Sequence, residues 1–166
     1  MRVHLLFLAV LFACCASAQE NKPPSPTPFQ VEYTIHDGND PVAKDGRHYI
    51  LQVDNSNSRG SVRSGAKVPY ATGTANGAVT QWNYADVGVN IDCRLYEKDG
   101  RLMMNSSFDL SSVAPTPQSG PGPAVIQVRT ETGTIVAIGK QMTLLNIDDP
   151  QMQRKLRVEA LVTQIK

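Results

Sequence analysis

The sequence predicts an all-β protein, built as an antiparallel sandwich or a partly closed barrel of about seven to nine strands. Apolar and polar residues alternate along most of the chain, and no stretch keeps a convincing helical period. Clusters of Gly, Pro, Asn and Asp separate the alternating segments. Each such segment can bury one face only, so each needs partners in a sheet.

Two short segments precede this predicted domain, which covers residues 29–166. Residues 1–18 combine an early Arg2, an apolar run and an Ala16-Ser17-Ala18 site, the pattern of a secretory signal peptide. Residues 19–28 contain four prolines and little to bury, which predicts an extended Pro-rich linker. We therefore expect an exported protein, periplasmic or secreted, with outer-membrane association as a further option. The alternative is a lipid on Cys14, which follows a poor lipoprotein-processing box.

Charge and cysteine content exclude two classes of protein. The chain has sixteen Lys plus Arg against fifteen Asp plus Glu, and removal of the signal peptide takes away one arginine. A mature chain with balanced charge has no electrostatic footprint for nucleic acid. Of the three cysteines, only Cys93 lies outside residues 1–18. A disulfide framework within one chain is therefore excluded, and stability must come from a packed core.

The predicted strands follow one another with turn residues between them. The strongest prediction is a β-hairpin over residues 87–111, turning at Asp99-Gly100, because Asp-Gly tolerates the positive φ angles of a tight turn. The last segment, 153–164, alternates strictly and favours a strand over a helix. The other predicted strands carry the alternating residues Phe29 to Ile35, Tyr49 to Val53, Ile126 and Val128, Val136 and Ile138, and Met142 and Leu144.

Three features carry local expectations. Cys93 shares a strand face with apolar residues, so we expect it to be buried and inert. Gly88 interrupts an apolar strand, which indicates a bulge or a close backbone approach. Trp82 and Tyr84, with Tyr70 upstream, either line a binding surface or cover an edge of the core.

The residues that catalysis or metal binding requires are missing from the pattern. His36 and His48 have no cysteine partner and no ligand spacing, so we expect surface histidines. The oxygen-rich segments 36–40 and 148–150 are interpreted as turns, because a full set of calcium ligands is absent. No nucleophile elbow or phosphate-binding glycine motif occurs. We predict no enzyme, and no catalytic, cofactor-binding or metal-binding residue; a small-molecule ligand stays undefined.

Three segments in order resemble the secretin domain, found in the outer-membrane ring channels of type II and III secretion and type IV pilus systems. They are Val62-Arg63-Ser64-Gly65-Ala66-Lys67-Val68-Pro69-Tyr70-Ala71-Thr72-Gly73, Tyr84-Ala85-Asp86-Val87-Gly88-Val89-Asn90-Ile91, and Asp109-Leu110-Ser111-Ser112-Val113. The resemblance covers residues 60–148 and implies a β fold that assembles. The family's Val-Pro-Leu-Leu…Pro segment does not follow Gly139, so we expect neither a working pore nor autonomous membrane insertion.

Two functional hypotheses follow. The first is a non-enzymatic envelope or secretion-associated module that acts by contact with a protein partner, or with itself, through β edges. The second is a stand-alone secreted ligand-binding or inhibitor-like protein that uses the Pro/Gly-rich loop at 114–123.

Overall fold

The computed structural model describes residues 25–38, 45–75, 78–113, 125–149 and 154–165. The predicted signal peptide, most of the linker and the loop at 114–123 lie outside these ranges. The described residues form eight strands and no helix. The described residues therefore contain no helix that is long and apolar enough to cross a membrane.

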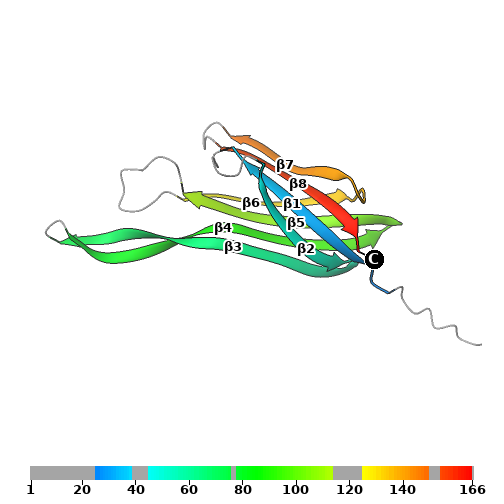
Figure 1. Cartoon of the computed structure of the whole chain (residues 1–166), viewed down its shortest axis with the longest axis horizontal. Coiled ribbons are helices and arrows are strands. Elements are labelled where there is room, and N and C mark those ends of the chain that lie inside the picture. The colour runs from blue at the N-terminus through cyan, green and yellow to red at the C-terminus, as the bar shows by residue number, and fades with distance from the viewer. Residues whose placement is uncertain (1–24, 39–44, 76–77, 114–124, 150–153, 166) are drawn as a thin grey trace, which may run out of the picture.

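The strands form two antiparallel sheets of four that pack as a sandwich, the first of the two arrangements predicted (Figure 1). Sheet A has the order β2 (Arg47–Asp54), β1 (Pro28–Asp37), β8 (Arg154–Gln164), β7 (Gln141–Asp149). Sheet B has the order β3 (Ser56–Ala75), β4 (Ala78–Lys98), β5 (Arg101–Val113), β6 (Val125–Ile135).

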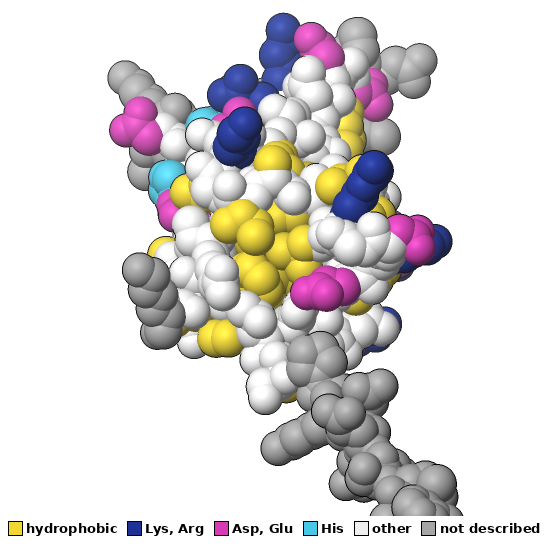
Figure 2. Space-filling view, turned by 90° about the vertical axis from the view of Figure 1, so that its right-hand side faces the viewer, with side chains coloured by type: hydrophobic (Ala, Val, Ile, Leu, Met, Phe, Trp, Pro, Cys, Tyr) yellow, Lys and Arg dark blue, Asp and Glu magenta, His cyan; other side chains and the backbone are white. Residues whose placement is uncertain are grey.

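The core lies between the two sheets and confirms the alternation seen in the sequence. Sheet A contributes Phe29, Val31, Tyr33, Ile35, Leu51, Val53, Leu156, Val158, Ala160 and Val162. Sheet B contributes Val89, Ile91, Cys93, Leu95, Met104, Phe108 and Leu110. At the end of the sandwich opposite the long β3–β4 hairpin, apolar side chains reach the surface (Figure 2).

The predicted 87–111 hairpin is confirmed, and its turn has the expected geometry. Lys98 pairs with Arg101, while Asp99 and Gly100 have φ angles of 52° and 70°. Positive φ at both central residues matches the twist of the flanking strands.

Three sequence interpretations of secondary structure need correction. Val136 and Ile138 do not form a strand: β6 ends at Ile135, and Ile138 is 51% exposed in the connection to β7. Gly139, at φ 73°, reverses the chain there. The helix alternative for 153–164 is wrong, since residues 154–164 form β8. The 20-residue strand β3 was not predicted from alternation, because only a few of its residues are large and apolar.

The chain passes from sheet A to sheet B through a single residue, Asn55. Its side-chain oxygen accepts a hydrogen bond from the Thr27 N–H at 2.8 Å, and its amide donates to Glu97 at 2.7 Å. The Asp54 carboxylate accepts hydrogen bonds from the backbone N–H of Ser56 and the hydroxyl of Ser58. These bonds fix the corner at which β3 leaves β2.

A polar contact joins the two sheets inside the core. The Tyr33 hydroxyl of β1 lies 2.6 Å from the Ser106 hydroxyl of β5, and both residues are buried. The Tyr33 ring also meets Phe108 edge-to-face, with ring centroids 5.5 Å apart. Because a buried hydroxyl needs a partner, this contact favours one alignment of the sheets.

Tyr33→Phe should lower the free energy of unfolding by about 1–2 kcal/mol, because it leaves the Ser106 hydroxyl without this partner in the core. Ser106→Ala should have a similar effect, and the double variant should cost less than the sum of the two. Urea unfolding followed by circular dichroism measures all three. Tyr49→Phe, at a partly exposed position in β2, is the matched control. Strict additivity would show that the two hydroxyls do not act as a pair.

Candidate functional site: a sheet edge, a ribbon and a polar face

The β3–β4 hairpin extends well past the rest of sheet B as a two-stranded ribbon (Figure 1). Pairing between β4 and β5 runs from Lys98 back to Gly88, which lies opposite Ser111. Beyond it, β3 and β4 continue to pair with each other as far as Ala75 and Ala78. We call residues 66–75 and 78–87 the ribbon. A two-stranded hairpin alone is only marginally stable in water, so packing against another segment would stabilise the ribbon.

Aromatic side chains stand on one face of this ribbon. Trp82 and Tyr84 are each 57% exposed, and they pair with Ala71 and Pro69 across the hairpin. Neither Trp82 nor Tyr84 packs against the core, so the alternative that they cover an edge of the core is wrong. Tyr70 lies on the other face and is partly buried. Exposed neighbouring aromatics are typical of surfaces that contact a partner.

The ribbon begins where two glycines face each other, and this confirms the expected close approach at Gly88. Gly65 pairs with Gly88, whose φ is 155°. A Cβ atom at Gly88 would collide with the carbonyl oxygen of Ser64 and the Cα of Gly65. The Gly88 N–H donates to the Ser111 hydroxyl at 2.9 Å. At this end of the β4–β5 ladder, the acceptor is therefore a side chain.

The two edges of sheet B differ in how they are protected. Along β3, the pairing with β4 has register shifts, and the strand carries Pro69 and several cations. Bulges, prolines and charges are devices that discourage further strand pairing. By contrast, β6 pairs with β5 over 11 residues without a register shift and contains no proline. Among the described strands of sheet B, β6 is the edge most open to another strand.

The outward face of sheet B is polar and carries cross-strand ion pairs. Asp92 accepts hydrogen bonds from Arg59, from Arg63 at 2.7 Å and from Ser61 at 2.8 Å. The bond from Arg59 is the main cause that holds the pKa of Asp92 well below its usual value, and the carboxylate stays ionised. Farther along the same face, Lys67 pairs with Asp86 at 2.9 Å.

Asp109 forms a second cluster on this face. Its carboxylate accepts hydrogen bonds from Gln127 at 2.6 Å and Arg129 at 2.8 Å. Both bonds lower the pKa of Asp109, the one from Gln127 more strongly. These contacts tie β5 to β6.

The predicted surface histidines lie in sheet A, each beside a glutamate. His36 Nε2 is 3.3 Å from Glu159, and His48 Nδ1 is 3.0 Å from Glu32. In the described part of the chain, no group of three or more His, Cys, Asp or Glu side chains could hold a metal ion. The segments 36–40 and 148–150 lie partly outside the described residues.

Cys93 is buried between the sheets, as expected from its strand face. Burial raises the pKa of its thiol, which disfavours the reactive thiolate. Among the described residues, the hydroxyls of Tyr33 and Ser106 are the polar groups that hydrogen-bond to this thiol.

Comparisons with known proteins find similar structures but no similar sequences. No family model and no curated protein matches the chain. The chain is similar to the secretin-domain β-barrel of InvG from the Salmonella SPI-1 injectisome NC-base, with a TM-score of 0.56 and 12% identity, covering 85% of this chain and 64% of that one. A cryo-EM structure of the InvG secretin of the Salmonella SPI-1 type III secretion injectisome gives a TM-score of 0.50 and 11% identity, over 85% of this chain and 65% of that one. The described domain therefore has a secretin-like fold, and the chain spans somewhat less than two thirds of those structures.

Gly88→Val should destabilise the protein by about 2 kcal/mol or more, because a side chain there collides with β3 and favours a different φ. Asn90→Thr, one position along the same outward face, should change stability by less than about 0.5 kcal/mol. Melting temperatures compare the two variants. Equal values would show that the glycine pair has no special role.

Cys93 should react with a thiol reagent only as fast as the protein unfolds, because the buried thiol is both inaccessible and protonated. The labelling rate should rise steeply with urea. Fast labelling without denaturant would contradict the buried position.

Proposed function

We propose that this protein is an exported, non-enzymatic β domain of the cell envelope, associated with a secretion assembly and joined to further copies of itself through the free edges of sheet B. The secretin-like fold supports the association with secretion, and the signal-peptide pattern of residues 1–18 supports export. The observation that carries self-assembly is β6, an edge strand of 11 residues in unbroken register.

The strand directions make a head-to-tail assembly of copies geometrically simple. Strands β3 to β6 alternate in direction across sheet B, so β3 and β6 run opposite ways. A second copy in the same orientation can therefore place residues 59–68 of its β3, which contain no register shift and no proline, beside β6 and keep the sheet antiparallel. Because the two edges differ, the contact is heterologous, and repetition gives a ring or an open filament.

The ribbon fits the same proposal. Beyond Gly88, the side of β4 that faces β5 elsewhere is unpaired within the described residues. In an assembly, neighbouring ribbons can supply the strands and apolar contacts that one ribbon lacks. Trp82 and Tyr84 then gain partners.

The competing function, a stand-alone ligand-binding or inhibitor-like protein, was assigned to the loop at 114–123, which lies outside the described residues. We predict that one copy does not insert into membranes by itself. The sustained apolar face of β4 and β5 is used by the core, so it is not free to face lipid. Purified protein should therefore be silent in planar bilayers, and stepwise conductance would contradict this.

Thr132→Lys should weaken self-association without unfolding the domain. Thr132 lies opposite Ser106 on the inward face of the β6 edge, and it is only partly buried. An inward-pointing charge on an edge strand opposes the approach of another strand. Sedimentation velocity over a wide concentration range should show the unaltered protein in equilibrium between monomers and larger species, and the variant shifted towards monomers.

Thr143→Lys, at an exposed position of β7 in sheet A, is the matched control and should associate like the unaltered protein. Urea unfolding of each variant separates lost assembly from lost folding. A concentration-independent monomer for the unaltered protein would overturn the proposed self-assembly. Equal association of the unaltered protein and Thr132→Lys would exclude β6 as the edge.

A further inference from the structure

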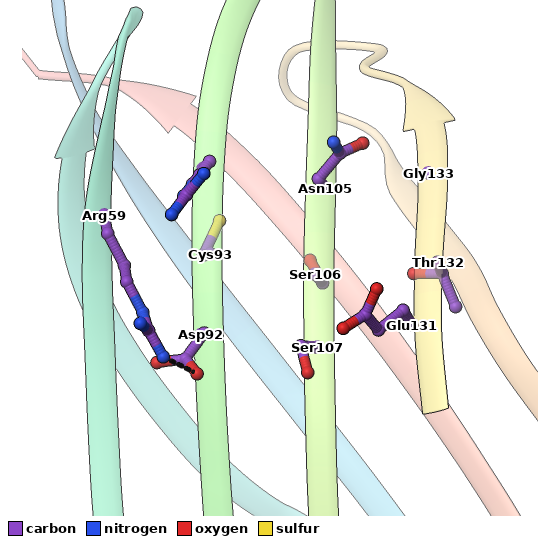
Figure 3. Close-up of a pocket in the computed structure, with 10 residues that line it drawn as sticks. Arg59, Asp92, Cys93, Asn105, Ser106, Ser107, Glu131, Thr132 and Gly133 are labelled. Carbon is purple, nitrogen blue, oxygen red and sulfur yellow. Dashed lines mark hydrogen bonds and ion pairs between the residues drawn. The ribbon is translucent and has the colours of Figure 1, made fainter. Parts of the chain in front are cut away.

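A hollow of about 480 Å³ opens on the outward face of sheet B, across β4, β5 and β6 (Figure 3). Small residues form its floor: Asn105 and Ser107 on β5, and Gly133 on β6. Longer side chains border it, with Arg59 and Asp92 on one side and Glu131 on the other. The hollow therefore arises from residue size along neighbouring strands.

Two opposite charges at this hollow are unmatched within the described residues. Register places Arg94 beside Asn105 and Gly133, and places Asp92 beside Ser107 and Glu131. Asp92 is already neutralised by Arg59 and Arg63. Neither the Arg94 nor the Glu131 side chain makes a hydrogen bond or ion pair with any described residue.

Arg94 and Glu131 do not form an ion pair with each other in the structure. They belong to β4 and β6, which β5 separates, so their backbones lie about 10 Å apart across the sheet. In Figure 3 the Glu131 carboxylate points towards β5 and Ser107. A molecule lying across β5 can therefore meet a guanidinium at one end and a carboxylate at the other.

The neighbouring row of the same face is apolar. Tyr96, Met103 and Ile135 stand side by side on β4, β5 and β6, next to the row that holds Arg94. Ile135 is 50% exposed and, with Met103, also lines an adjoining hollow of about 430 Å³. An apolar group attached near the anionic end of a ligand would lie on this row.

We propose that this hollow binds a short zwitterionic peptide whose last residue has an apolar side chain. Arg94 and the Asn105 amide hold the terminal carboxylate, since a guanidinium presents paired donors to a carboxylate. Glu131 and the Ser107 hydroxyl hold the terminal ammonium group. Met103 and Ile135 contact the apolar side chain. This site lies on the outward face of sheet B, whereas the proposed assembly uses the edges of that sheet, and the two proposals share only strand β6.

The test is a titration of the protein with Ala-Leu, followed through backbone amide shifts in NMR spectra. Shifts should concentrate on residues 92–96, 103–107 and 131–135. Each charged contact at an exposed site is worth up to about fivefold in affinity. Amidation of the peptide's carboxylate, or acetylation of its amine, should each weaken binding by that factor.

Variants of the protein test which end of the peptide each charged residue binds. Arg94→Gln should weaken binding of Ala-Leu and remove the penalty for amidation, while the penalty for acetylation remains. Glu131→Gln should do the reverse. Arg129→Gln and Asp86→Asn remove one charge of each sign elsewhere on the same face, and should leave binding unchanged.

Several outcomes overturn the proposal. One is the absence of localised shifts up to millimolar peptide. Another is equal binding of the free, amidated and acetylated peptides. A third is binding that neither Arg94→Gln nor Glu131→Gln affects. If acetate alone binds as well as Ala-Leu, the hollow is an anion site and the peptide is excluded. Sedimentation of the same samples reports assembly separately, so either proposal can fail alone.

Discussion

The contact of Tyr33 with Ser106 and Phe108 is the interaction on which the arrangement of the two sheets depends. The three residues belong to β1 and β5, which are interior strands of sheets A and B. Apolar packing alone tolerates sliding of one sheet over the other, because many alignments bury similar area. A buried hydroxyl pair does not, since most other alignments leave both groups unsatisfied. The hydroxyl pair contributes little to the free energy of folding. Its larger effect is to favour one alignment of the two sheets over the others.

That alignment determines which part of sheet B is left uncovered. The strands of sheet A have 8 to 11 residues, whereas β3 and β4 have 20 and 21. With the sheets fixed near Tyr33, the surplus length must project at one end. The paired glycines at 65 and 88 mark the start of that projection, and β5 stops pairing with β4 there. The ribbon is thus a consequence of strand length and a fixed alignment.

Alternation predicted the strands whose inward residues are large and apolar, such as Phe29 to Ile35 and the 87–111 hairpin. It failed for β3, whose Gly, Ser, Lys and Arg residues pair with β4 without much burial of their own. It also misplaced Val136 and Ile138, because two alternating apolar residues look the same in a strand and in a tight connection. The hollow near Arg94 could not be predicted from the sequence, because it depends on the register of three strands, which places Arg94, Asn105 and Glu131 around it.

Strand β6 serves both the open edge and the hollow, and this shared use has a thermodynamic consequence. Its small residues, Thr132, Gly133 and Thr134, leave the edge without bulky protection and leave room beside Glu131. A strand added along β6 would alter the surroundings of Glu131, and a ligand held by Glu131 would restrain β6. If both events occur, any change that assembly makes in ligand affinity must be matched by an equal change that the ligand makes in assembly. The sign of that coupling depends on whether the added strand leaves the mouth of the hollow open.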